Sequence, residues 1–207
     1  MPKTALFFVL VLPLPLGGAL LAQEDAVPFD PAGAERLATK KLSGYEATPP
    51  LVVEKMLELA QVRRGEWVYD LGSGDGRIVI MAAQKFGAHG VGIELDPHWV
   101  RLSVSKIQVA GLFEQVQIIE GDVLEQDLSA ADVVAIYTTP YGTLKLRPHL
   151  EKSLKDGARV VTCVYHIPDW KPARTMSVRA NGSKTYELKL YRMSRQSQGV
   201  SFSKFGR

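Results

Sequence analysis

Cysteine is almost missing from this chain: among 207 residues there is one, Cys163. A single cysteine excludes an intramolecular disulfide and any cysteine-rich metal site. Because Cys163 lies in the apolar run 158–165, we expect a buried strand thiol rather than a reactive nucleophile. The four histidines, at positions 89, 98, 149 and 166, show no metal-ligand spacing. The sequence therefore predicts neither a disulfide scaffold nor a metal centre.

The chain also has no long basic stripe and no cluster of interleaved basic and aromatic residues. Its formal net charge is only +3, with 46% hydrophobic and 23% charged residues, as in ordinary globular proteins. This mild charge permits an acidic partner but does not require one, so nucleic acid is not the expected partner. The length suits one domain with a full hydrophobic core.

A long apolar run, residues 5–22, stands near the N-terminus. It follows Lys3 and ends in small residues, an order typical of a signal peptide, and Gly17 and Ala19 satisfy the small-x-small rule for cleavage. The run is also just long enough to span a bilayer, so an uncleaved membrane anchor is the alternative. Two prolines inside the run count against a buried helix of the domain.

The remaining chain alternates between strand and helix patterns. We expect a linker over 23–44, a folded domain over 45–193 and a flexible polar tail over 194–207. The apolar patterns predict strands over 67–71, 91–94, 116–119, 133–136 and 159–165, and helices over 77–86, from 96 onward, and over 144–154. Thr48 is expected to cap a helix that begins at Pro49-Pro50. Asn181-Gly182, between two further strands, predicts a hairpin, and the whole predicts a Rossmann-like α/β fold with a mostly parallel seven-stranded sheet.

A glycine-rich turn, 72–76, follows the first predicted strand. The dinucleotide fingerprint G-x-G-x-x-G is not complete here, because Arg77 stands where its third glycine belongs. Asp70 and Asp75 bracket the turn and would repel a pyrophosphate, at about 1 to 4 kcal/mol for unit charges in contact. S-adenosylmethionine has no phosphate and carries an ammonium and a sulfonium, so the same carboxylates favour it. The turn residues expected to contact this cofactor, besides these two carboxylates, are Gly72, Ser73, Gly74 and Gly76.

Two further carboxylates follow the next two strands. Glu94 lies 24 residues after Asp70, where a carboxylate can accept hydrogen bonds from both ribose hydroxyls. Asp122 can accept a hydrogen bond from the adenine amino group, with Val123 packed against the ring. The order and spacing of these residues indicate one cofactor site.

These stretches resemble those of class I methyltransferases, and more narrowly those of the lysine methyltransferases that act on the ATP synthase c-subunit and on the adenine nucleotide translocase, with their bacterial relatives. The similarity covers residues 70–80, 91–97, 156–161 and 168–170 and spans Tyr45 to Trp170. It implies the class I methyltransferase fold, S-adenosylmethionine as cofactor and a lysine of a protein as methyl acceptor. The segment 45–49 is similar to the family pattern Tyr-x-Pro-Thr-Pro, except at Ala47. The resemblance implies that Tyr45 and Thr48 close over the methionine end of the cofactor.

The methyl acceptor is expected beyond the fourth strand. Tyr137, Thr138 and Tyr141 are predicted to line its pocket, with Tyr45 as a cover. Transfer from a sulfonium mainly needs alignment and exclusion of water, so no catalytic triad is required. A small-molecule or RNA methyltransferase and a non-catalytic cofactor-binding scaffold remain the alternatives.

Two features of the sequence give opposite indications of the cellular compartment of the domain. Lys3 before the apolar run and Glu24-Asp25 after it orient the domain outward, whereas S-adenosylmethionine is made in the cytosol. The sequence thus predicts a chain that is membrane-anchored or exported, without fixing the side of the membrane or the oligomeric state.

Overall fold

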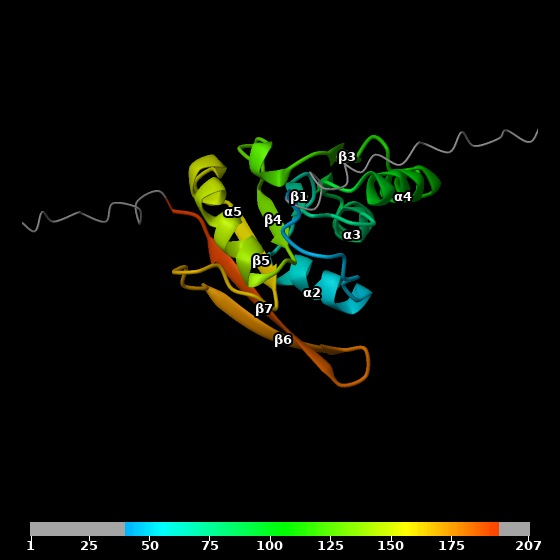
Figure 1. Cartoon of the computed structure of the whole chain (residues 1–207). Coiled ribbons are helices and arrows are strands. Elements are labelled where there is room, and N and C mark those ends of the chain that lie inside the picture. The colour runs from blue at the N-terminus through cyan, green and yellow to red at the C-terminus, as the bar shows by residue number, and fades with distance from the viewer. Residues whose placement is uncertain (1–39, 195–207) are drawn as a thin grey trace, which may run out of the picture. The chain divides into compact units, whose positions relative to one another are not determined.

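The computed structural model describes residues 40–194, which build one seven-stranded sheet with helices on both faces (Figure 1). The strands are β1 (Trp67–Leu71), β2 (His89–Glu94), β3 (Val116–Glu120), β4 (Val133–Ile136), β5 (Arg159–Cys163), β6 (Arg174–Ala180) and β7 (Lys184–Arg192). The helices are α2 (Pro50–Leu59), α3 (Arg77–Phe86), α4 (Pro97–Val109) and α5 (Pro140–Ser153), with a short 3₁₀ turn η1 (Val123–Glu125).

The strand order is β3-β2-β1-β4-β5-β7-β6. The first five strands of this order pair in parallel, whereas β7 pairs antiparallel with both β5 and β6. The predicted mostly parallel sheet with a closing antiparallel hairpin is therefore confirmed. The order reverses direction at β1, which places a crevice at the carboxyl ends of β1 and β4, where open α/β sheets bind ligands.

The core lies on both faces of the sheet, because its central strands are buried on both sides. On one face, α2 and α3 pack against β1, β4, β5 and the hairpin; Met56, Leu57 and Tyr186 are among the largest side chains there. On the other face, α5 contributes Leu146 and Leu150. Cys163 is buried in β5, as expected, and burial raises the pKa of its thiol to about 12.

Several expected boundaries differ from the structure; strand β2, for example, begins at His89, two residues before the predicted start. Thr48 does not cap α2: the helix begins at Pro50, the capping position is Pro49, and no side chain caps it. A residue before proline is pushed toward extended backbone, so two successive prolines move the boundary forward. Helix α5 begins at Pro140, four residues before the predicted start, because the Thr139 side chain accepts a hydrogen bond from the Gly142 amide. Strand β5 ends at Cys163, since the next residue has φ +67°.

The predicted signal peptide or anchor, most of the linker and the polar tail beyond residue 194 lie outside the described residues. The last five positions of the linker, 40–44, are described and contact the domain through Lys40, Lys41 and Leu42. Among residues 40–194, no helix combines the length and apolar character needed to cross a bilayer.

Candidate active site

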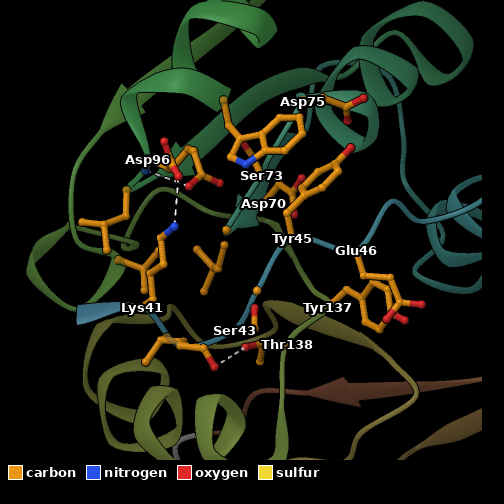
Figure 2. Close-up of a pocket in the computed structure, with 18 of the residues that line it drawn as sticks. Lys41, Ser43, Tyr45, Glu46, Asp70, Ser73, Asp75, Asp96, Tyr137 and Thr138 are labelled. Carbon is orange, nitrogen blue, oxygen red and sulfur yellow. Dashed lines mark hydrogen bonds and ion pairs between the residues drawn. The ribbon is translucent and has the colours of Figure 1, made fainter. Parts of the chain in front are cut away.

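An open cavity of about 910 Å³, including the space that faces solvent, lies at the carboxyl ends of four strands. Its walls come from the turn after β1, the end of β2, the start of η1 after β3, and the segment after β4 (Figure 2). This edge of an open α/β sheet is where such folds bind their ligands. Most of the residues predicted for the site line it: Tyr45, Thr48, Asp70, Gly72, Ser73, Asp75, Glu94, Asp122, Val123, Tyr137 and Thr138.

Three of the predicted residues do not line the cavity. Gly74 lies directly beneath the Tyr45 ring, where an added Cβ would come within 2.5 Å of Tyr45 Cε2. Gly76 occupies the left-handed capping position of α3, with φ +77°, and faces Ser103 instead. The side chain of Tyr141 is 57% exposed on α5 and packs beneath Lys145. The two glycines therefore shape the turn, and Tyr141 lies outside the wall that was predicted for it.

Asp70 is the most deeply buried carboxylate of the cavity, at 2% exposure. Burial, followed by the charges of Glu94 and Asp75, raises its pKa to about 8. Without a ligand, this carboxyl group therefore holds a proton at neutral pH. A cationic ligand would favour its ionised form, because an opposite charge stabilises a carboxylate.

Asp75 has a different role from the one that the sequence suggested. Its carboxylate accepts hydrogen bonds from Arg77 Nε at 2.7 Å and from Lys106 Nζ at 2.5 Å. Despite burial, these two cations lower its pKa to about 2. The charge of Asp75 is thus offset within the protein, so the predicted attraction for a cationic cofactor falls mainly to other carboxylates.

The glycine turn contributes to the cavity wall one buried polar atom, Ser73 Oγ, that has no hydrogen-bond partner among the described residues. At Gly72, with φ +84°, an added Cβ would meet no atom within 4 Å, so the backbone itself forms the wall there. Close backbone approach and an unpaired hydroxyl both suit a polar ligand against this turn.

Glu94 is oriented by the backbone around it. Its two oxygens accept hydrogen bonds from the amides of Gly74 at 2.7 Å and Asp96 at 2.9 Å. A carboxylate has about four acceptor positions, so two remain for a ligand. Asp122 similarly accepts from the Leu124 amide at 3.0 Å, and its other oxygen lies 3.5 Å from Lys40 Nζ. Both carboxylates are therefore fixed in direction and keep acceptor capacity.

Residues 40–48, which we call the strap, form one wall of the cavity (Figure 2). Lys41 pairs with Asp96 at 2.9 Å, and the Leu42 carbonyl accepts a hydrogen bond from Thr139 at 2.8 Å. Tyr45 stacks on Trp99 with ring centroids 3.7 Å apart. Sequence reasoning found Tyr45 and Thr48 but missed the first half of the strap.

Arg77 fastens the strap to the glycine turn, and it too was missed as a site residue. Its guanidinium donates to the Thr48 carbonyl at 2.7 Å and to the Tyr45 hydroxyl at 3.0 Å, while it also binds Asp75. The only signal for this role was its position directly after the turn. Its partners lie 29 and 32 residues away in the chain, so spacing alone does not reveal them.

The wall after β4 carries the predicted acceptor residues Tyr137 and Thr138. Burial raises the pKa of Tyr137 well above the ordinary tyrosine value, and the nearby carboxylate of Glu46 in the strap adds to the shift. Tyr137 is therefore a neutral donor at physiological pH and cannot act as a base. Thr138 is buried and donates to the Leu42 carbonyl at 3.4 Å.

Charge distinguishes this cavity from a phosphate-binding one. Its lining includes six acidic side chains and three basic ones: Glu46, Asp70, Asp75, Glu94, Asp96 and Asp122 against Lys40, Lys41 and Arg77. Each of the three basic side chains is paired with a carboxylate. Because Asp70 is protonated without a ligand and Asp75 is offset by Arg77 and Lys106, the negative charge open to a ligand comes mainly from Glu94, and from Asp70 once it ionises beside a cation. This charge suits a positive ligand, as S-adenosylmethionine is, and opposes a pyrophosphate.

Comparison with known proteins agrees with this chemistry. A protein-lysine N-methyltransferase of Saccharolobus islandicus is 38% identical over 148 residues, which are 71% of this chain and 91% of that protein. A human lysine N-methyltransferase of the ATP synthase c-subunit is 38% identical over 120 residues, and the chain spans about half, 51%, of that protein. A crystal structure of an RNA methyltransferase from Salinibacter ruber with S-adenosyl-L-homocysteine is 41% identical, with a TM-score of 0.68, and the match covers 72% of this chain and 95% of that one.

Residues 70–174 match the family model described as the ANTKMT methyltransferase domain. This stretch begins at the buried carboxyl group of β1, contains every strand from β2 to β5, and ends at the first residue of β6. The chain belongs to this methyltransferase family and is an S-adenosylmethionine-dependent methyltransferase.

Proposed function

We propose that the enzyme methylates a lysine amine of a protein substrate. The observation that carries this proposal is the charge of the cavity: six acidic and three basic side chains, with every basic one paired. A lysine ammonium is attracted to such a lining, whereas an RNA backbone brings phosphates that it repels. The names of the Saccharolobus and human relatives support the same acceptor.

We further propose how the cavity holds its cofactor. The buried Asp70 faces the positively charged end, Ser73 supplies a free hydroxyl, and Glu94 accepts from the ribose hydroxyls with its two remaining acceptor positions. Asp122 and Val123 border the adenine. Tyr45, held by Trp99 and Arg77, closes the site over the turn.

When bound, S-adenosylmethionine supplies a methyl carbon on a positively charged sulfur. That carbon would be open to attack by the lone pair of an acceptor nitrogen, with the electron pair of the broken carbon–sulfur bond left on the sulfur. The protein must therefore align the amine, let it lose its proton before the attack and keep water from the methyl group. Tyr137 and Thr138 would position the amine, and the strap would exclude water. The proton leaves to solvent, since Tyr137 is already protonated.

RNA is the second candidate acceptor, because the 41% identical structure from Salinibacter ruber is described as an RNA methyltransferase. One experiment distinguishes a protein acceptor from an RNA acceptor. The enzyme is incubated with cell extract and S-adenosylmethionine labelled in its methyl group, and the product is divided between protease and ribonuclease. We expect the label to be released by protease only and to appear as methyl-lysine by mass spectrometry. Release by ribonuclease alone would replace this proposal with the RNA one.

We also propose that residues 5–22 attach the chain to a membrane or direct its export. The support is the apolar composition of this run and the basic Lys3 before it. The test compares membrane fractionation of the whole chain with that of a chain that begins at Gln23. Equal recovery of both in the soluble fraction, without cleavage, would overturn the proposal.

A further inference from the structure

One lysine of the protein itself lies against the acceptor wall. Lys184, at the start of β7, places its ammonium 2.5 Å from a carboxylate oxygen of Glu46. The same nitrogen lies 4.9 Å from the centre of the Tyr186 ring. A carboxylate and an aromatic face are two groups that stabilise an ammonium. The protein thus already holds a lysine side chain at Glu46.

Glu46 also faces the cavity. It lines the cavity together with Tyr137, and Figure 2 shows their side chains next to each other on the wall away from Asp96. Tyr137 packs against the core cluster that contains Tyr186, and its pKa is raised by burial and by the nearby Glu46 carboxylate. A tyrosine fixed by the core therefore stands next to the carboxylate of Glu46 in the cavity wall. Lys184 is not among the lining residues, so it binds Glu46 from outside the cavity.

The pair between Glu46 and Lys184 is suited to exchange. Its side chains are 57% and 49% exposed, respectively, and exposed ion pairs contribute little to stability. A second ammonium that enters the cavity would meet the same carboxylate and the Tyr137 hydroxyl. The free energy needed to displace Lys184 from Glu46 is small, because water then solvates the lysine ammonium, which also remains near the Tyr186 ring.

We propose that Glu46 and Tyr137 form the receiving site for the amine of the methyl acceptor, and that Lys184 occupies the Glu46 carboxylate until the acceptor displaces it. This inference rests on the proposed lysine acceptor. Glu46 binds the charged amine and does not take part in the transfer, since a carboxylate next to an amine opposes loss of its proton. Its contribution therefore appears in the affinity for the acceptor, not in the turnover of the bound one.

The test measures acceptor kinetics and acceptor binding with a peptide library that carries one lysine per peptide. We expect Glu46→Gln to raise KM for the peptides about tenfold, with the affinity for S-adenosylmethionine unchanged and kcat not lowered. Tyr137→Phe should raise KM less, and Lys184→Met should lower it about threefold. Glu58→Gln is the matched control, because Glu58 also pairs with a lysine, Lys55, on an exposed face of α2.

A second measurement does not depend on turnover. With S-adenosylhomocysteine present, calorimetry compares binding of lysine peptides with that of the same peptides in acetyl-lysine form. The wild type should prefer the lysine form, and Glu46→Gln should remove that preference. If Glu46→Gln and Glu58→Gln behave alike in both measurements while the wild type methylates the peptides, this inference is wrong and the proposed function stands. If the wild type binds its cofactor but methylates no lysine, the proposed function fails, and this inference fails with it.

Discussion

The Tyr45 ring lies flat on the indole of Trp99, with the ring centroids 3.7 Å apart and the planes 22° from parallel. Tyr45 belongs to the strap and Trp99 to α4, so this pair joins two parts of the chain above Gly74. Stacked aromatic pairs contribute about 0.5–1.5 kcal/mol beyond their buried area. The pair therefore helps to hold the strap closed over the glycine turn.

Removal of this ring should weaken cofactor binding. We expect Tyr45→Ala to reduce the affinity for S-adenosylmethionine about tenfold, since both the stack and the cover over Gly74 are lost. Tyr45→Phe keeps the stack and loses only the hydrogen bond from Arg77, so its effect should be about threefold or less. Calorimetry measures both, and equal losses in the two variants would contradict the role given to stacking.

Asp70 should couple cofactor binding to proton release. Its pKa is about 8 in the free protein, and a cationic ligand favours the ionised form. Binding at pH 7 should release close to one proton, and affinity should rise between pH 6 and 8. Calorimetry in two buffers of different ionisation enthalpy measures the proton directly. A binding enthalpy independent of the buffer would show that Asp70 stays protonated in the complex.

The same group should lower the stability of the cofactor-free enzyme as pH rises. An unfolded aspartate has a pKa of about 3.9, so between pH 4 and 8 the unfolded chain has released a proton that folded Asp70 keeps. Stability is therefore lost across this window. Asp70→Asn cannot ionise, so its melting temperature should exceed that of the wild type by an increasing margin from pH 5 to 8, while cofactor binding is abolished. A constant difference across the window would mean that burial does not raise this pKa.

Arg77 should protect the enzyme against acid. The pKa of Asp75 is about 2 because Arg77 and Lys106 stabilise its ionised form, and this stability is lost as pH falls from about 4 to 2. Arg77→Gln removes one of these cations and releases Tyr45 and Thr48. We expect a midpoint of acid unfolding at higher pH than in the wild type, together with weaker cofactor binding. Arg101→Gln, at an exposed position of α4, is the control and should leave both quantities unchanged.

Gly92 should be intolerant of any side chain. A Cβ at this position of β2 would come within 2.5 Å of Ser73 Oγ and 2.6 Å of Ile118 Cδ1. Gly92→Ala should therefore displace the glycine turn, lower the melting temperature and weaken cofactor binding. Gly90→Ala, in the same strand, is the matched control, because its added Cβ would come within 2.7 Å of Val79 Cβ and its nearest atoms all belong to Val79 rather than to the glycine turn. Equal cofactor affinity in the two variants would show that the turn adapts without loss.

Sequence patterns predicted the sheet and the cofactor side of the cavity because both depend on local signals. The strands β1 and β4 begin and end at the predicted residues, since short buried apolar runs bounded by turn residues are distinctive. The carboxylates Asp70 and Glu94 were found because the turn and the strand ends fix their position along the chain. Their roles in binding the cofactor stay predictions until the variants above are measured.

What could not be predicted depends on pairing between distant segments. Lys41 binds Asp96 across 55 residues, and Lys184 binds Glu46 across 138. Neither pair leaves a periodic pattern in the sequence. One prediction from a local pattern was wrong. Thr48 and Thr139 both precede a proline, but only Thr139 caps a helix, because the proline after Thr48 is followed by a second proline at position 50.

The strand order divides the cavity into two parts whose walls follow different strands of the sheet. The walls predicted for the cofactor follow β1, β2 and β3, which lie on one side of the place where the strand order reverses. The wall predicted for the acceptor follows β4, and Lys184 of the antiparallel hairpin approaches it through Glu46. The hairpin loop can therefore vary in sequence and length without disturbing the glycine turn, whereas the strap is tied to that turn through Tyr45 and Thr48. Methyltransferases built in this way can acquire new acceptors by exchanging peripheral segments, while the chemistry of the methyl donor is inherited unchanged.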